Sequence, residues 1–291
     1  MIRAAVLGQD VSKSRSPAIH NAAYKALGIE GRFEAISVDA SGFNKMVQDL
    51  GALGYHYVNV TIPYKGAAAA AATTRSAMVR NCGAANTLIF EPPAAAFSSE
   101  NPSGVGFHAL HAENTDGYGL LSALRDLGAD AGGQDAVLIG AGGAAAGAIE
   151  ALTSVGARVR VVARRLEAAT ALVERIPSQR RRLVKPFAWG DGGLAQALEG
   201  SRILVSSVPA DSWADAAATA GLDAVERDTA VLEMAYGTSA TSPLARAVRG
   251  RVARYSDGLG MLVHQAVRAM ELALGETPPL PPLFAAARNG K

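Results

Sequence analysis

Hydrophobic positions in the first third of the chain follow two different spacings. Short apolar runs predict strands, and longer segments in which apolar residues recur every three or four positions predict helices. The sequence predicts strands at residues 4–7, 33–38 and 57–60 and helices at residues 17–27 and 43–53, with a long alanine-rich helix after Lys65. Strands that alternate with helices indicate a mostly parallel sheet covered by helices.

A second α/β pattern follows in the rest of the chain. It begins with strands at 86–90 and 107–112, separated by a loop rich in proline and serine at 91–106, and a helix at 116–127. It continues with strands at 136–139, 158–162, 203–207, 230–234 and 252–255, helices at 144–155, 243–248 and 261–274, and a proline-rich tail. We expect two α/β units joined by helices, with a cleft between them, and a length of 291 residues agrees with two domains.

Composition and charge narrow the possible partners. Apolar residues make up 49% of the chain, and a net charge of +2 is too small to indicate nucleic acid or an acidic membrane as a partner. We expect Arg180–Arg182 to form a solvated turn. Cys82 is the only cysteine, which excludes an intrachain disulfide. No apolar run approaches the ~20 residues that span a bilayer, and no signal peptide is recognisable, so we expect a cytoplasmic protein without a membrane partner.

A glycine-rich segment, Gly140-Ala141-Gly142-Gly143-Ala144-Ala145, lies directly after a predicted strand and opens a predicted helix. Gly140 permits a tight turn, Gly142 lets a pyrophosphate approach the backbone, and Ala145 is small enough for the helix to pack against the sheet. The first N–H groups of the helix would then face the phosphates. The segment therefore predicts a dinucleotide site; the alternative is an ordinary strand–turn–helix corner in a chain rich in alanine and glycine.

The end of the next predicted strand bears on the choice of dinucleotide. NAD-binding folds usually place an acidic residue there to hold the ribose hydroxyls. This chain has Ala163, Arg164 and Arg165 instead. Two guanidinium groups suit a 2′-phosphate, which arginine can bind in bidentate fashion. The position therefore predicts NADP, and the alternative is two exposed surface arginines.

Five segments of the chain resemble the shikimate dehydrogenase family, in family order. They are residues 14–17, 59–65, 83–87, 114–117 and 257–265. The resemblance implies an α/β fold of two domains with the active site in the cleft between them. A mostly parallel substrate domain would comprise residues 1–117 and 257–291, and a Rossmann-like NADP-binding domain residues 118–256.

The family's activity is the reversible NADPH-dependent reduction of 3-dehydroshikimate to shikimate, on the route to chorismate and the aromatic amino acids. The resemblance implies this activity here, with NADP as cofactor, a small-molecule substrate as partner, and a monomer or homodimer as the assembly. Two alternatives stay open: an NAD-linked quinate/shikimate dehydrogenase, and a non-catalytic regulatory protein that binds shikimate and NADP. The missing acid after the second strand of the cofactor domain disfavours the first, and the presence of Lys65 and Asp116 disfavours the second.

The resemblance also assigns roles to individual residues. Lys65 and Asp116 correspond to the catalytic pair. The substrate-binding positions are Ser14, Ser16, Asn59, Thr61, Asn86, Tyr236 and Gln265. The expected cofactor-binding positions are Gly140, Ala141, Gly142, Gly143, Ala144, Ala163, Arg164, Arg165, Met234 and Gly258, of which the last two correspond to residues beside the nicotinamide. No metal-ligand spacing occurs, so no metal is expected.

The chemistry of these residues agrees with such roles. Ketone reduction creates an alkoxide that needs a proton donor, and we expect Lys65, at a helix start, to be that donor. The helix dipole would lower the pKa of Lys65 and a facing Asp116 would raise it, so the net shift stays open. The alternative for Asp116 is a structural role alone, as the cap of its helix. Ser16, before Pro17, is expected to be an N-cap, whereas Ser14 has no such structural need and is expected to bind a ligand carboxylate.

The chain departs from the family pattern in three places. Residues 205–209, Val-Ser-Ser-Val-Pro, stand where the family commonly has Asn-Ala-Thr-Pro, near the nicotinamide. Ala163 replaces a usual asparagine, and Arg165 is an additional basic group. The loop at 91–106 is longer than expected. We expect His264 to serve in packing rather than in the reaction.

Overall fold

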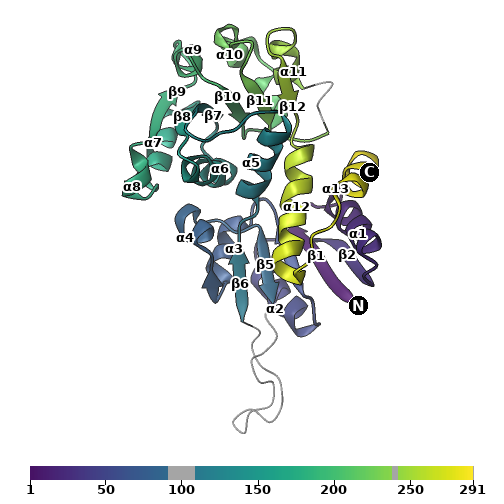
Figure 1. Cartoon of the computed structure of the whole chain (residues 1–291). Coiled ribbons are helices and arrows are strands. Elements are labelled where there is room, and N and C mark those ends of the chain that lie inside the picture. Colours follow the sequence, from purple (N-terminus) through teal and green to yellow (C-terminus); the bar gives the residue numbers. More distant parts are fainter. Residues whose placement is uncertain (91–108, 238–241, 291) are drawn as a thin grey trace. The chain divides into compact units, whose positions relative to one another are not determined.

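The computed structural model describes residues 1–90, 109–237 and 242–290. The chain divides into two compact units (Figure 1). The first unit comprises Met1–Thr115 and Ala266–Lys291, and the second comprises Asp116–Gln265. We predicted boundaries between the substrate and cofactor domains at 117/118 and 256/257. The two compact units instead meet at 115/116 and 265/266, and the second of these boundaries lies within helix α12 (Leu259–Leu274).

The described strands of the first unit form a six-stranded mixed sheet in the order β2-β1-β3-β5-β6-β4. β1 pairs in parallel with β2 and β3, and β5 runs antiparallel to both of its neighbours, β3 and β6. The bounds are β1 (Ile2–Gly8), β2 (Gly31–Ser37), β3 (Tyr57–Val60), β4 (Thr74–Arg75), β5 (Thr87–Phe90) and β6 (Leu110–Glu113). The expected parallel character holds for β1, β2 and β3, while the reversal of β5 makes the sheet mixed.

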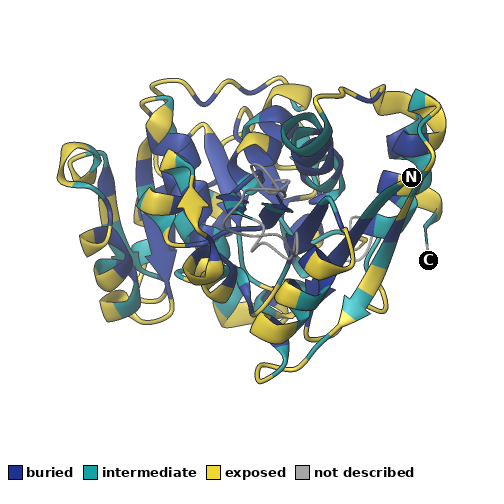
Figure 2. Cartoon of the chain, turned by 90° about the horizontal axis from the view of Figure 1, so that it is seen from below, coloured by how far each residue is buried: buried dark blue, intermediate teal, exposed yellow. Residues whose placement is uncertain are grey.

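Helices of the first unit pack against the sheet because each has an apolar face. One core cluster joins Phe43, Val47 and Leu50 to the strand residues Val58 and Leu88. Helix α1 packs against α13 and β2. The bounds are α1 (Ser16–Leu27), α2 (Phe43–Ala52), α3 (Lys65–Ala71), α4 (Ala77–Cys82) and α13 (Leu280–Asn289). The burial pattern in Figure 2 agrees: the strands are mostly buried, whereas the helices carry exposed outer faces.

The second unit contains a six-stranded sheet whose described strands are all parallel, in the order β12-β11-β10-β7-β8-β9. The bounds are β7 (Asp135–Ile139), β8 (Arg158–Ala163), β9 (Val184–Ala188), β10 (Ile203–Ser206), β11 (Ala230–Glu233) and β12 (Arg254–Ser256). Read from the β9 edge, these are the third, second, first, fourth, fifth and sixth strands of the unit. This is the strand order of dinucleotide-binding Rossmann folds, so the predicted fold class is confirmed.

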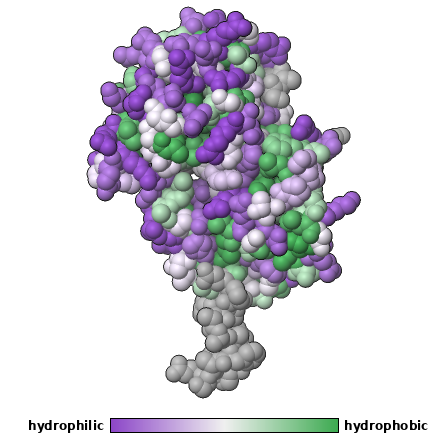
Figure 3. Space-filling view, viewed as in Figure 1, coloured by the Kyte–Doolittle hydropathy of each residue, from purple (hydrophilic) through white to green (hydrophobic). Residues whose placement is uncertain are grey.

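Helices of the second unit lie along this sheet and carry its polar surface. On the face of this unit that Figure 3 shows, the surface is mostly hydrophilic and is broken by hydrophobic patches. Inside, Trp189 and Trp213 pack with ring centroids 4.7 Å apart. The bounds are α5 (Asp116–Asp126), α6 (Gly143–Ser154), α7 (Leu166–Glu174), α8 (Ser178–Arg181), α9 (Gly193–Leu198), α10 (Ala216–Thr219) and α11 (Pro243–Val248). Among the described residues, no helix is long and apolar enough to cross a membrane.

Several local predictions were wrong. The helix after Lys65 is short and ends at Ala71, and the proline-rich tail contains helix α13, whose prolines lie in its first turn, where their missing N–H costs nothing. Residues Arg180–Arg182 do not form the solvated turn that we expected. Arg180 and Arg181 end helix α8, and Arg180 forms an ion pair with Glu150, a buried carboxylate of α6. The predicted loop at 91–106 lies outside the described residues.

A buried polar cluster lies beneath helix α1. The Nδ1 atom of His20 is 2.7 Å from the Tyr57 hydroxyl, which is 2.8 Å from the Tyr24 hydroxyl. The His20 ring stacks on Phe33 with a centroid separation of 3.9 Å and is fully buried. Its Nε2 atom has no hydrogen-bond partner among the described residues. Burial lowers the pKa of His20 to about 3, because the interior disfavours the charged imidazolium.

Replacing His20 by glutamine should make the free energy of unfolding less dependent on pH. Between about pH 3 and 6.5, the ordinary pKa of histidine, the unfolded wild-type chain binds a proton at this position and the folded chain does not. Its stability therefore falls on acidification by about 1.4 kcal/mol per pH unit from this residue alone, and H20Q lacks that contribution. Urea unfolding at several pH values measures it.

The control is Lys25→Gln, an exposed substitution in the same helix that introduces the same side chain without removing a histidine. It should follow the wild-type dependence on pH. Parallel stability curves for H20Q and the wild type between pH 4.5 and 6.5, a window set by the lowered pKa of His20, would contradict the account.

Candidate active site

The segment after β1 carries Ser14 and Ser16, both predicted to bind substrate. Helix α1 begins at Ser16, its N-cap is Arg15, and Pro17 lies in the first turn. The Oγ atom of Ser14 accepts a hydrogen bond from the Ser16 backbone N–H at 3.3 Å. The predicted N-cap role of Ser16 is therefore wrong. Ser14 also has a local structural role after all, because its hydroxyl satisfies a backbone donor of the helix's first turn.

Asn86 lies at the centre of a buried network at the carboxyl end of β3 and the facing ends of β5 and β6. Its Oδ1 atom accepts from the Thr115 backbone N–H at 2.8 Å, and its Nδ2 atom donates to the Thr115 hydroxyl at 3.0 Å. Asn59 joins the network by donating to the Thr87 hydroxyl at 2.9 Å. Its Oδ1 atom is buried and has no partner among the described residues. These bonds fix Thr115, the residue directly before Asp116.

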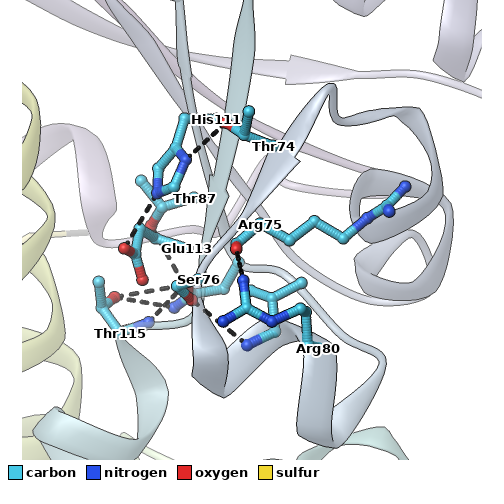
Figure 4. Close-up of polar contacts among 10 residues, drawn as sticks. Thr74, Arg75, Ser76, Arg80, Thr87, His111, Glu113 and Thr115 are labelled. Carbon is cyan, nitrogen blue, oxygen red and sulfur yellow. Dashed lines mark hydrogen bonds and ion pairs between the residues drawn. The ribbon is translucent and has the colours of Figure 1, made fainter.

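A second polar group lies beside this network on the same sheet (Figure 4). His111 bonds to the Thr74 hydroxyl through Nδ1 at 2.8 Å and to Glu113 through Nε2 at 3.1 Å. Because Thr87 and Glu113 face each other across β5 and β6, the group adjoins the Asn86 network. The sequence did not predict a role for this group or for Thr115. The available signal was position, because Thr115 lies within the segment 114–117 that carries the family resemblance and Glu113 directly precedes it.

A tight turn places Thr61 and Lys65. The Thr61 N–H donates to the Leu7 carbonyl at 2.9 Å, and a Cβ atom placed on Gly8 would lie 2.6 Å from Cγ2 of Thr61, so β1 and the turn are in close contact. The Tyr64 hydroxyl donates to the Val38 carbonyl at 2.7 Å. Lys65 then begins α3 with a half-buried side chain. The turn that leads into Lys65 is therefore held by β1 and by Val38.

Asp116 is the first residue of α5, and its side chain is half-buried. Gln265, in α12, is buried, and its Nε2 atom donates to the Leu262 carbonyl of the same helix at 2.9 Å. His264, expected to serve in packing, contacts Asp126 of α5 through Nε2 at 2.7 Å. That contact links the two helices. Tyr236 follows β11 and is half-buried.

The glycine segment adopts the strand–turn–helix geometry expected of it. β7 ends at Ile139, Gly140 has a φ of 114°, and α6 begins at Gly143 with Gly142 as its N-cap. A Cβ atom on Gly140 would lie 2.4 Å from the Ser207 hydroxyl, so only glycine fits. Apart from adjoining residues of the same segment, no described atom lies within 4 Å of a Cβ atom placed on Gly142 or Gly143. The start of α6 is thus open to an approaching phosphate.

The family departure at residues 205–209 is explained by internal bonds. The Ser207 hydroxyl and backbone N–H both donate to the Ile139 carbonyl, at 2.7 and 2.9 Å. The Ser206 hydroxyl accepts from the buried Trp213 indole at 3.0 Å. Ser207 therefore holds the end of β7, directly before the glycine segment, and Ser206 holds the segment that carries Trp213. No pattern in the sequence predicted either role.

Four further predicted cofactor residues follow the carboxyl ends of other strands of this sheet. Arg164 and Arg165 follow β8, and both are exposed. Their side chains have no hydrogen-bond or ion-pair partner within the described parts of the chain. Met234 and Gly258 are in direct backbone contact, because a Cβ atom on Gly258 would lie 2.0 Å from the Met234 carbonyl oxygen. The described residues contain no cluster of histidine, cysteine and carboxylate groups able to hold a metal ion.

Comparisons with known proteins find a matching family model and relatives that cover most of the chain. Residues 6–88 match the family model of the shikimate dehydrogenase substrate binding domain. A protein of Caulobacter vibrioides named shikimate dehydrogenase (NADP(+)) is 34% identical over 277 residues, which cover 94% of this chain and 90% of that protein.

Solved structures share the fold. Shikimate 5-dehydrogenase from Thermus thermophilus, in complex with NADP(H) and shikimate, matches with a TM-score of 0.81 and 27% identity over 100% of both chains. The 5-ketofructose reductase of a Gluconobacter species matches with a TM-score of 0.81 over 99% of this chain and 98% of its own, at 22% identity, so that likeness concerns the fold alone. Because it is 34% identical to the Caulobacter protein along nearly its whole length, this chain belongs to the shikimate dehydrogenase family of oxidoreductases.

Proposed function

We propose that the protein catalyses the reversible reduction of 3-dehydroshikimate to shikimate with NADPH. The observation that carries the proposal is the 34% identity, over 94% of the chain, to a relative named shikimate dehydrogenase (NADP(+)). The predicted catalytic and substrate-binding residues support it, since each of these positions keeps the residue type that the family resemblance requires. Purified protein should therefore consume NADPH when 3-dehydroshikimate is added. The expected cytoplasmic location and the assembly as a monomer or homodimer stay predictions.

The residues present fit a nicotinamide dinucleotide. The Gly140 turn and the open start of α6 offer backbone N–H groups to a pyrophosphate, and the two exposed arginines after β8 offer guanidinium groups to a 2′-phosphate. Ala145, fully buried, lets α6 pack closely on the sheet. Bound NADPH would supply the hydride in the proposed reaction.

The remaining chemistry is the work of the chain's own side chains. We assign Lys65 as the donor of the proton that neutralises the developing alkoxide, and Asp116 as the group that orients the ammonium. Ser14 and Ser16, near the start of α1, are assigned to the substrate carboxylate. Asn59, Thr61, Asn86, Tyr236 and Gln265 are assigned to the ring hydroxyls. These polar groups would favour a polyhydroxylated substrate over an apolar one, because a missing hydroxyl would leave buried polar atoms unpaired.

Replacing Arg164 by glutamate should raise the KM for NADPH by about tenfold or more and lower the KM for NADH. The substitution removes a charge-assisted hydrogen bond to the 2′-phosphate, worth about 1.5–3 kcal/mol, and places there the acid that favours a free ribose. Initial rates with each cofactor measure the shift. Arg182→Glu, on another exposed arginine of the same unit, should leave both KM values unchanged.

An R164E protein with an unaltered preference for NADPH would show that the 2′-phosphate binds elsewhere. The glycine segment could still bind a dinucleotide in that case. A stronger contradiction would be a wild-type enzyme that uses NADH as well as NADPH.

A further inference from the structure

Helices α5 and α12 approach each other unusually closely at Gly119. A Cβ atom placed on Gly119 would lie 2.6 Å from the Met261 carbonyl oxygen, 3.0 Å from Cβ of Gln265 and 3.2 Å from its backbone nitrogen. Gly119 is buried within α5, and all of these residues belong to the second unit. Two of the three contacts are backbone atoms of a helix, which cannot turn away as the end of a flexible side chain can.

The contact joins two residues to which the proposed function gives roles. Gly119 lies three positions after Asp116, so the two share a face of α5. Gln265 lies directly against Gly119 from α12. The separation of these two helices therefore sets how far Gln265 lies from the turn that carries Asp116.

We propose that Gly119 is a positioning residue, which holds Asp116 and Gln265 at their working separation by allowing the two helices to meet backbone to backbone. The inference rests on the proposed function. Reacting and binding groups must be held to within about 0.5 Å, and a displacement of about 1 Å can cost about 10²-fold in rate. An added methyl group at Gly119 would force a displacement of this order, because the Met261 carbonyl has to move out of its way.

The helix pair provides a matched control. Gly260 is also a glycine of α12, and a Cβ atom placed there would meet only Cβ of Ala123, at an ordinary contact distance of 3.7 Å. Gly119→Ala and Gly260→Ala are thus the same chemical change in neighbouring helices of one unit. Only the first requires the helices to separate.

The test compares the steady-state kinetics of wild type, G119A and G260A with 3-dehydroshikimate and NADPH. G119A should lose about 10- to 100-fold in kcat/KM for 3-dehydroshikimate, whereas its affinity for NADPH should stay near that of the wild type. G260A should match the wild type in both. NADPH affinity is measured by the quenching of the fluorescence of Trp189 and Trp213, which also shows that the second unit is folded.

Two results would overturn the inference: wild-type kcat/KM in G119A, or loss of NADPH binding together with turnover, which would show that Gly119 serves general folding. A crystal structure of G119A gives a readout that does not depend on the substrate, and it should show α5 and α12 further apart than in the wild type. If wild-type protein itself failed to reduce 3-dehydroshikimate, the proposed function would fail, and the structure of G119A would still decide the steric part of the inference.

Discussion

Replacing Lys65 by alanine should lower kcat for 3-dehydroshikimate reduction by a factor on the order of 10² or more. Hydride addition to the ketone carbon leaves negative charge on oxygen, and without the ammonium group that charge must be neutralised by water. The variant should fold normally, because Lys65 is half-buried at the first position of α3 and the backbone bonds around it do not involve its side chain. The measurement is the initial rate of NADPH consumption at saturating substrate.

Lys45→Ala is the matched control for this experiment. Lys45 lies in α2 of the same unit, with 76% of its side chain exposed and an ion pair to Asp49. Its removal should leave kcat unchanged, since exposed pairs of this kind contribute little. Near-normal turnover of K65A would remove Lys65 from the mechanism, even if the protein were a shikimate dehydrogenase in every other respect.

Replacing Gly258 by alanine should lower the free energy of unfolding by about 3 kcal/mol and weaken NADPH binding. The added Cβ atom would lie 2.0 Å from the Met234 carbonyl oxygen and 2.6 Å from its carbon. The Gly258 N–H also donates to the Ala235 carbonyl at 3.0 Å, so the two segments cannot separate without losing a hydrogen bond. Met234 is a proposed neighbour of the nicotinamide, which couples the packing defect to the cofactor.

Urea unfolding and NADPH titration measure these two effects separately. G260A, two residues along the chain, again has room for its methyl group and should be as stable as the wild type or slightly more stable, because alanine favours helix. A G258A protein with wild-type stability would mean that the close contact at Met234 relaxes without cost. Unchanged NADPH affinity with reduced stability would instead remove Met234 from the cofactor site.

Local chemistry is what made much of this fold predictable. Gly140 turns the chain between β7 and α6 because its φ of 114° favours glycine, and such a requirement is visible within a few residues of sequence. The helix expected at residues 17–27 does end at Leu27, and Gly28 follows it in the left-handed conformation that commonly ends helices. Both features depend on neighbours in sequence.

Features that depend on distant partners escaped prediction. Arg180 was expected in a solvated turn because nothing near it in sequence reveals the buried Glu150, thirty positions earlier along the chain. The Ser207 hydroxyl is likewise explained only by the Ile139 carbonyl, 68 positions away. In the candidate site, Asn86 could be named from the family resemblance, but its bonds to Thr115 required the pairing of β5 with β6.

The most direct test of the proposed function is one set of assays with the purified wild-type enzyme, in which shikimate and quinate are each oxidised with NADP⁺ and with NAD⁺. Shikimate with NADP⁺ should have the highest kcat/KM of the four combinations. Turnover of shikimate with NAD⁺ that equals or exceeds that with NADP⁺ would contradict the cofactor assignment. Preference for quinate, or no turnover in any combination, would contradict the function itself.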